Sequence, residues 1–335
     1  MIARRLRLMF ATGIAVAVAM TPLSASAASS TLMNATVPLE VSSSNPPAVA
    51  DQRGDAFLFT GQVFRFDAHT DTSGYTSGRL PNSQGKTAAA AWDPALQRAF
   101  LFGGATCTST GCDTADQISS YDPATDSATV MGARLPQPIA FASAAYVGGF
   151  IYIFGGALPT CCPYTDQIVR YDPVNDAISV MNATLPSPRI NMSEAVFGSS
   201  VYLFGGCCTF TEDTGGYNEI VRYDTLTDTT QLMSARLPTG RYYTSAARLG
   251  NSMYIFGGTS GGFKDLSLDA YYSDIVRYNP AADTASISPV ALPSGRAFTA
   301  AVAISNRAYV FGGFSADPSG QHYYPDIVRF DPSGP

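Results

Sequence analysis

The chain has 335 residues, of which 46% are hydrophobic and 14% are charged, and its formal net charge at pH 7 is −6. An acidic chain with no basic stripe cannot neutralise a phosphodiester backbone, so we exclude nucleic acid as a partner. Beyond the N-terminus no segment approaches the roughly 18 continuous apolar residues of a membrane-spanning helix, so we expect no membrane insertion.

The first 27 residues have the three parts of a secretory signal peptide. Three arginines between residues 4 and 7 precede an apolar run over residues 8–20, and Ala25-Ser26-Ala27 follows. We expect cleavage after Ala27 and a secreted or periplasmic protein, because the apolar run is too short for a comfortable membrane span. Removal of residues 1–27 would leave a net charge of −9, and we expect residues 28–335 to form one domain.

A short phrase, an aromatic-apolar strand ending in two glycines, recurs along the chain. The glycine pairs begin at Gly103, Gly155, Gly205, Gly257 and Gly312, in steps of 52, 50, 52 and 55 residues. A weaker copy with one of the two glycines, residues 56–61, precedes them. A period of about 50 residues built from short strands is typical of a β-propeller rather than of a helical solenoid. Six copies predict six blades.

Each copy contains four apolar stretches that are separated by turn residues. In the copy around Gly156 these stretches are residues 141–147, 150–154, 167–171 and 177–181. Glycine pairs, Asp-Pro and Leu-Pro end them, which predicts four short antiparallel strands per blade.

The last copy ends near Asp331 without a fourth strand, and the missing strand is found at the other end of the chain. Residues 31–38 (TLMNATVP) closely match residues 180–186 (VMNATLP). We therefore expect the mature N-terminus to supply the outer strand of the last blade. That pairing would close the ring and remove exposed sheet edges.

These motifs resemble the kelch repeat family over residues 31–332. The specific marks are the glycine pair, the Tyr-Asp-Pro turn and the Leu-Pro exit. Many kelch repeats carry a tryptophan in the fourth strand, where this chain has Met131, Met181 and Met233. The resemblance implies an all-β, six-bladed kelch-type propeller, similar to exported bacterial members. It also implies binding on the face formed by the loops after strands two and four.

Two charged positions recur from copy to copy, and recurrence favours a structural role. Strand three carries Arg65, Arg170, Arg222, Arg277 and Arg329, for which we expect inter-blade packing and ion pairing. The turn between strands three and four carries Asp126, Asp176, Asp228 and Asp283. We interpret these aspartates as turn residues that bond their own backbone, rather than as metal ligands.

Cations and aromatic residues gather in the loops of the expected binding face. The cations that follow Leu-Pro are Lys86, Arg189, Arg241 and Arg296. The aromatic candidates are Tyr164, Tyr217, Tyr242, Tyr243, Tyr271, Tyr272, Phe298, Tyr323 and Tyr324, together with His322. Four cations ringed by aromatic groups would suit a carboxylate or an acidic sugar. The alternative is that an arginine before strand one is simply a consensus residue of the scaffold.

Glu194 departs from the repeat. It stands in the innermost strand of the fourth copy, where three others have Ala144, Ala246 and Ala301. Arg248 is similarly unusual, two residues further along the strand of the next copy. Because residues two apart share one face of a strand, we expect both side chains to face the same way, as an ion pair or as part of a pocket. A carboxylate near arginines could also act as a general acid or base.

All six cysteines fall in loops after strand two: Cys107, Cys112, Cys161, Cys162, Cys207 and Cys208. In an exported protein an even number of loop cysteines indicates disulfides, and six cysteines allow fifteen connectivities. Cys107–Cys112 is the favoured local pair. The two adjacent pairs could form vicinal disulfides or link neighbouring loops. Zinc is a poor alternative, because no paired C-x-x-C spacing exists.

Two functions remain open. Because no strong catalytic motif is present, we favour a non-enzymatic protein that recognises a glycan or a protein ligand and needs no cofactor. The alternative is an enzyme acting on an acidic sugar, because exported six-bladed kelch proteins include sialic acid mutarotases; this is an analogy of fold. A copper radical oxidase is excluded, since His69 and His322 lie in loops expected on opposite faces.

Overall fold

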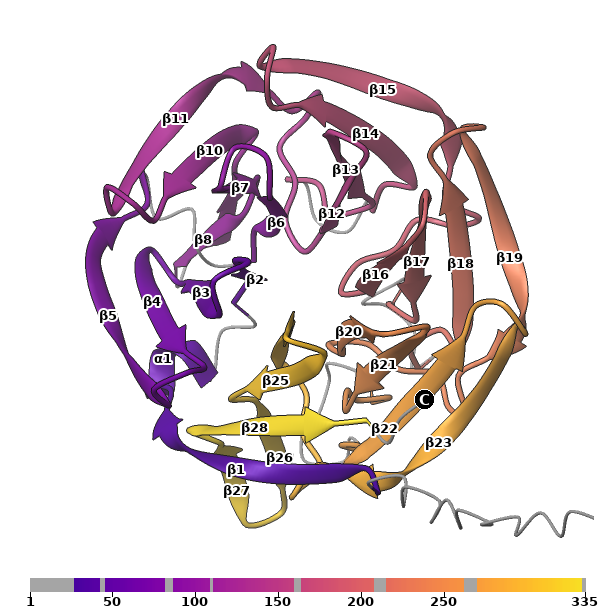
Figure 1. Cartoon of the computed structure of the whole chain (residues 1–335). Coiled ribbons are helices and arrows are strands. Elements are labelled where there is room, and N and C mark those ends of the chain that lie inside the picture. Colours follow the sequence, from indigo (N-terminus) through magenta and orange to yellow (C-terminus); the bar gives the residue numbers. More distant parts are fainter. Residues whose placement is uncertain are drawn as a thin grey trace, which may run out of the picture.

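A computed structural model describes residues 27–42, 46–81, 87–108, 111–159, 164–207, 215–261 and 270–332. Six four-stranded antiparallel sheets surround a central axis (Figure 1). Among the described residues the single helix is the short α1 (Leu39–Ser42). The fold is an all-β, six-bladed propeller with four strands per blade, as the repeat predicts.

The blades follow one another in chain order, each built from its innermost strand outward. The first has β2 (Ala48–Ala50), β3 (Asp55–Phe59), β4 (Gln62–Asp67) and β5 (Thr72–Arg79). The second has β6 (Ala89–Asp93), β7 (Arg98–Phe102), β10 (Gln117–Asp122) and β11 (Ser127–Arg134). The third has β12 (Ser143–Val147), β13 (Phe150–Phe154), β14 (Gln167–Asp172) and β15 (Ala177–Thr184).

The remaining three blades repeat this order. The fourth has β16 (Ser193–Phe197), β17 (Ser200–Phe204), β18 (Glu219–Asp224) and β19 (Thr229–Arg236). The fifth has β20 (Ser245–Leu249), β21 (Ser252–Phe256), β22 (Asp274–Asn279) and β23 (Thr284–Ala291). The sixth has β24 (Ala300–Ile304), β25 (Arg307–Phe311), β28 (Asp326–Asp331) and, outermost, β1 (Ser29–Thr36).

The core lies between neighbouring blades. Second strands are buried on both faces because each sheet packs against two others, and all five residues of β17 are buried. Aromatic rings interlock across each junction: Tyr152 and Phe154 contact Tyr223 of the next blade, with ring centroids 5.5 and 5.6 Å apart. The outermost strands face solvent on one side, so β15 alternates between exposed and partly buried residues.

The turn aspartates link neighbouring blades, which differs from the expectation that they bond their own backbone. Asp176 adopts a left-handed φ of 48° and accepts hydrogen bonds from the backbone of Gly132 (2.7 Å) and Ala133 (3.1 Å) in the preceding blade. The Tyr171 hydroxyl donates to the same carboxylate at 3.0 Å. The left-handed turn directs the carboxylate across the junction, so that it satisfies backbone donors at an irregularity in the neighbouring outer strand.

β1 occupies the position of a fourth strand. It pairs antiparallel with β28, and Val37 N donates to Pro325 O at 2.7 Å. Asp71 of the first blade accepts hydrogen bonds from Asn34 N (2.8 Å) and Ala35 N (3.1 Å). These bonds are the same inter-blade contacts that Asp176 makes to β11.

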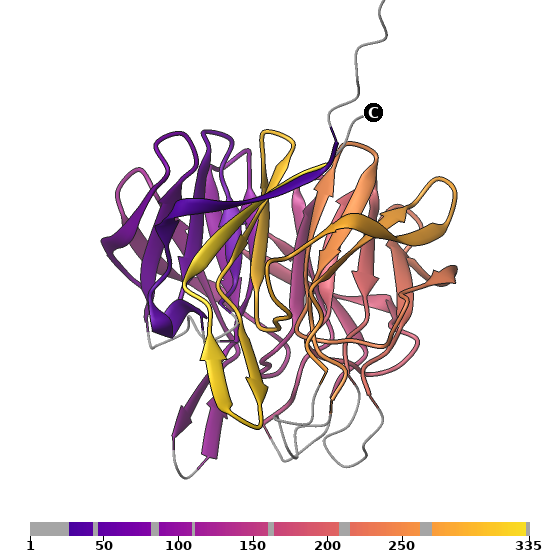
Figure 2. The same ribbon diagram turned by 90° about the horizontal axis from the view of Figure 1, so that it is seen from below.

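The two ends of the propeller differ. We call the end with the loops after second and fourth strands the loop face, and the opposite end the turn face. On the loop face these two loops meet in isolated bridges such as Ile190↔Cys207 and Tyr242↔Thr259. The hairpins β8 (Ala105–Thr108)–β9 (Gly111–Thr114) and β26 (Phe314–Asp317)–β27 (Gly320–Tyr323) project from it (Figure 2). Within the described ranges no helix is long and apolar enough to cross a membrane.

Candidate functional site

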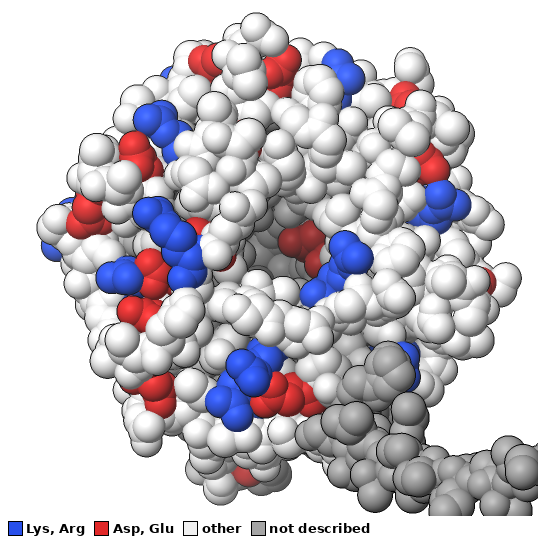
Figure 3. Space-filling view, viewed as in Figure 1, with Lys and Arg blue, Asp and Glu red and all other residues white. Residues whose placement is uncertain are grey.

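A channel runs along the propeller axis and is lined by the innermost strands. One level of it is a ring of equivalent side chains that contains five alanines and one glutamate: Ala48, Ala90, Ala144, Glu194, Ala246 and Ala301. Glu194 is the one charged residue among the described side chains that line this cavity of about 100 Å³. Figure 3 shows acidic surface inside the central hollow. The volume is enough for several water molecules.

The surroundings of Glu194 oppose its ionisation. Burial raises the pKa of its carboxyl group to about 7, and the nearby Ser143 side chain reduces this effect without cancelling it. No ion pair with Arg248 is present among the described contacts. Arg248 instead donates from Nε to Gly250 O (2.9 Å), and its guanidinium lies 4.9 Å from the ring centre of Phe197. The predicted ion pair between Glu194 and Arg248 does not form, because the Arg248 guanidinium bonds Gly250 O and packs on the Phe197 ring instead.

Hydroxyl groups join the innermost strands around this level of the channel. Ser143 donates to Met192 O at 2.9 Å. The hydroxyls of Ser193 and Thr244 are 2.8 Å apart, as are those of Ser245 and Thr299. These bonds satisfy the buried hydroxyls and leave Glu194 as the ionisable group exposed to the channel.

The predicted ring of cations is part of the scaffold. Arg189, Arg241 and Arg296 have exposed fractions of 0, 0 and 1%. Arg241 donates to both carboxylate oxygens of Asp274 (2.7 and 3.1 Å) and to Gly257 O (3.1 Å), with its guanidinium 4.3 Å from the Tyr272 ring centre. A guanidinium with these partners has no face left for a ligand.

The other two arginines repeat this arrangement. Arg189 pairs with Glu219 (2.8 Å) beneath the ring of Tyr217, at 4.5 Å. Arg296 pairs with Asp326 (2.9 Å) beneath Tyr324, at 4.1 Å. The geometry therefore supports a structural role for these arginines. The Tyr217 ring covers the Arg189 guanidinium. Lys86 lies outside the described residues.

Several predicted tyrosines meet in one aromatic cluster on the loop face. We define this aromatic cluster as Phe141, Tyr164, Tyr242, Tyr243, Tyr271, Phe298, Phe314 and Tyr323. Tyr243 stacks on Phe298 with ring centroids 3.8 Å apart. Contacts of 5.8 and 5.2 Å continue from Phe298 through Phe314 to Tyr323, which lies on the β26–β27 hairpin and is 38% exposed.

A ring of strained residues carries the aromatic cluster. The residues that precede the first strands have left-handed φ angles of 52 to 59°: Thr87, Phe141, Asn191, Tyr243 and Phe298. Backbone N–H groups link them in sequence, from Phe141 N to Thr87 O (2.8 Å) through to Phe298 N to Tyr243 O (3.1 Å). Such conformations cost about 1–3 kcal/mol each in bulky residues and concentrate at functional sites.

Asn191 is the residue of this ring that sequence reasoning missed. It is 4% exposed, and neither Oδ1 nor Nδ2 has a hydrogen-bond partner within the described part of the chain. A buried polar group without a partner costs about 1–3 kcal/mol. The available signal was an asparagine at a position held by Phe141, Tyr243 and Phe298 in neighbouring copies. Recognising it required knowing that these residues form one ring.

The structure describes three of the six cysteines for which disulfides were predicted. Cys107 stands opposite Cys112 in the backbone register of β8 and β9, and their disulfide stays a prediction. Cys207 is buried within the aromatic cluster. Cys161, Cys162 and Cys208 lie outside the described residues. In the ranges that the structure covers, no group of three or more acidic, histidine or cysteine side chains could hold a metal ion.

Comparisons with known proteins agree with this architecture. The sequence model of the KLHDC2/KLHL20/DRC7 Kelch-repeats domain matches residues 142–334, which is more than half of the chain. A solved structure described as "Structure of YjhT" superposes with a TM-score of 0.71 at 15% identity. The superposition covers 85% of this chain and 94% of that chain, and at this identity it shows a shared fold alone. No curated protein matches the chain.

Proposed function

The chain belongs to the KLHDC2/KLHL20/DRC7 Kelch-repeats domain family, and from this membership we propose that it recognises a glycan or a protein ligand through its loop face. The observation that carries the proposal is the aromatic cluster. Tyr323 and its neighbours present partly exposed rings on the face from which both hairpins project (Figure 2). Aromatic rings bury a large area with little conformational entropy and are enriched where proteins bind partners.

The chemistry of this face favours a neutral ligand over an acidic one. The three buried arginines already pair with Glu219, Asp274 and Asp326, so they supply no net positive charge to a ligand. Stacking on aromatic rings and hydrogen bonds from an amide such as Asn191 are the contacts that a neutral sugar or a peptide can use.

A thermal-shift screen of the protein without residues 1–27, against neutral and acidic sugars, tests the proposal. A ligand at a hundred times its Kd adds about 2.7 kcal/mol of stability. With the ligand found, Tyr323→Ala and Asn191→Gly are expected to weaken binding about tenfold or more. Asn191→Gly suits the left-handed φ of 54° and removes the unpartnered amide, so the variant should fold at least as well as the wild type.

Leu226→Ala is the matched control, because Leu226 is 82% exposed in the turn between β18 and β19, on the turn face. It should leave binding unchanged. Equal affinity of the wild type, Tyr323→Ala and Asn191→Gly would refute recognition through this face. If no sugar binds, the same variants are to be compared in binding assays with protein ligands.

A second function is favoured by one observation, the pKa of about 7 at Glu194. A carboxyl group poised near neutral pH suits proton transfer on an acidic sugar, as in a sialic acid mutarotase. The cavity of about 100 Å³ argues against it, because small-molecule sites usually span about 300–1,000 Å³. An anomer-exchange assay decides: activity that rises through about pH 7 and disappears in Glu194→Gln would establish the enzyme.

The proposed site of action is outside the cell or in the periplasm. The basic, apolar and small-residue parts of residues 1–27 support export. N-terminal sequencing of the recovered protein is expected to begin at Ala28, and an intact Met1 in the exported fraction would contradict the proposal.

A further inference from the structure

A second hollow lies on the turn face, between the first and second blades. Its volume is about 530 Å³, within the range of small-molecule sites. Phe57 of β3 and Tyr121 of β10 form its base, with ring centroids 5.7 Å apart, and Pro123 and Ala124 supply its accessible apolar surface. This hollow is separate from the channel and from the aromatic cluster, and neither function above involves it.

The sequence explains why space remains at this junction. The residue that corresponds to Phe57 is a tyrosine in the last four blades: Tyr152, Tyr202, Tyr254 and Tyr309. In the third blade the Tyr152 hydroxyl fills the junction, where it contacts Arg170 and Thr225. Phe57 has no hydroxyl.

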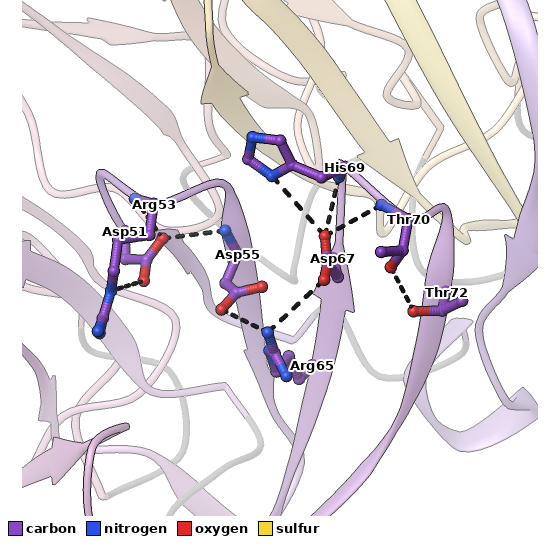
Figure 4. A network of polar contacts seen from close by, with 8 residues as sticks. All are labelled: Asp51, Arg53, Asp55, Arg65, Asp67, His69, Thr70 and Thr72. Carbon is purple, nitrogen blue, oxygen red and sulfur yellow. Dashed lines mark hydrogen bonds and ion pairs between the residues drawn. The ribbon is translucent and has the colours of Figure 1, made fainter.

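Charged side chains of both signs line the hollow (Figure 4). Arg65 lies between two carboxylates, 2.8 Å from Asp55 and 3.7 Å from Asp67. Arg53 contacts the buried Asp51 through Nε at 3.2 Å. His69 packs on Gly54 and lies 3.8 Å from Asp67. In Figure 3, basic and acidic side chains gather over β3 and β4.

These groups retain unused hydrogen-bonding capacity of both kinds. Arg53 is 62% exposed and engages Asp51 through Nε alone, which leaves both Nη groups for a ligand. Asp55 contacts Arg65 through Oδ2, which leaves Oδ1 as an acceptor. Asp126 is different, because Ser77, Gly78 and Tyr121 already saturate its oxygens and hold its pKa at about 2.

The balance of charges narrows the class of ligand. Three carboxylates and two guanidinium groups face the hollow, so an anion meets a net negative site. A simple cation would be repelled by the exposed Arg53 guanidinium, whose Nη groups would bond only water. A ligand that carries both charges satisfies both constraints.

We propose that the hollow between the first two blades binds a zwitterion, specifically a free α-amino acid with an apolar or aromatic side chain. Its carboxylate pairs with Arg53, its ammonium group pairs with Asp55, and its side chain lies against Pro123 and Ala124, above the Phe57 and Tyr121 rings at the base of the hollow. Complementary pairs at both ends, rather than a single strong charge, give the site its selectivity.

Titration calorimetry of the protein without residues 1–27 tests the proposal with three matched probes. They are L-phenylalanine, 3-phenylpropionate, which lacks the amine, and phenethylamine, which lacks the carboxylate. Phenylalanine is expected to bind with a Kd on the order of 1 mM or tighter, and about tenfold more tightly than either truncated probe. Equal affinity for a truncated probe, or no saturable binding of phenylalanine, would overturn the proposal.

Four variants assign the contacts. Phe57→Tyr adds the hydroxyl found in the last four blades and should weaken phenylalanine binding about tenfold, while Phe100→Tyr makes the same change at the next junction and should not. Asp55→Asn should abolish the preference over phenylpropionate, and Arg53→Gln the preference over phenethylamine. Equal effects of Phe57→Tyr and Phe100→Tyr would contradict the assignment. Tyr323→Ala should leave phenylalanine binding intact, because the two sites are independent.

Discussion

At the scale of single residues, the same side chain can indicate a ligand or a scaffold, and burial distinguishes the two. Three arginines follow Leu-Pro in a loop beside tyrosines, a pattern that fits anion recognition equally well. The structure buries their guanidinium groups against carboxylates and under tyrosine rings. The carboxylates that pair with these arginines lie 30 or more positions away in the sequence, as Asp274 does from Arg241. Sequence spacing alone could not reveal these pairs.

Replacing Arg241 should therefore destabilise the protein. Arg241→Ala leaves Asp274 and Gly257 O without their donor, and breaking a buried ion pair in this way costs about 3–5 kcal/mol. Urea denaturation should show this loss in the midpoint. Arg307→Ala removes an exposed pair with Asp331 and should cost less than about 1 kcal/mol. Similar midpoints for the two variants would mean that Arg241 is not a structural residue.

Residue identity was informative where it broke a repeated pattern. Glu194 was identified from sequence because three other copies have alanine at its position, and the structure places it in the channel. Phe57 departs less clearly, because Phe100 repeats it in the second blade, and a missing hydroxyl marks a hollow only when the neighbouring blade is known. Asn191 could not be identified from sequence, because its role depends on the left-handed φ angle that it shares with the equivalent residues of neighbouring blades.

At the scale of elements, strand order and number were predictable, because turn residues and alternating apolar residues mark every blade. The hairpins β8–β9 and β26–β27 were treated as loops, although Asp317-Pro318-Ser319-Gly320 is a recognisable turn sequence. Such hairpins lie outside the repeat, so the repeat itself could not predict them. The turn aspartates were assigned to the correct turns, but their partners lie 43 to 49 positions away, in neighbouring blades.

We propose that β1 closes the ring, and its removal tests this at the level of the element. Deleting residues 29–36 exposes the edge of β28 and leaves Asp71 without Asn34 and Ala35. An open sheet edge pairs with other chains, so the truncated protein should associate and melt earlier in light scattering and thermal unfolding.

Addition of a synthetic peptide with the sequence of residues 29–36 should restore the monomer and the midpoint. A truncated protein that stays monomeric and equally stable would show that closure does not depend on β1.

At the scale of the whole molecule, stability should depend on pH through Glu194. The folded state raises the pKa of this carboxyl group from its ordinary value near 4.5 to about 7, so the folded protein holds a proton that the unfolded chain releases. Stability then falls as pH rises from about 4.5 to about 7 and is constant above that range. The full penalty is about 3 kcal/mol.

Glu194→Ala, which restores the alanine of the other five blades, should remove this dependence. The variant should match the wild type near pH 4.5 and exceed it at pH 8 by up to about 3 kcal/mol in urea denaturation. Identical curves at both pH values would mean that the carboxyl group is hydrated normally. A residue that lowers stability in this way is a candidate for function, because stability and activity are often in conflict at functional sites.

The ring of five alanines and one glutamate also has a consequence for symmetry. At this level of the channel, six equivalent alanines would offer a guest on the axis six equivalent orientations. The single carboxylate removes that degeneracy. A guest bound beside it is confined to one rotational setting of six, at an entropic cost of about 1 kcal/mol, or RT ln 6. One substitution thus turns a repeated structure into one with a defined direction around its axis.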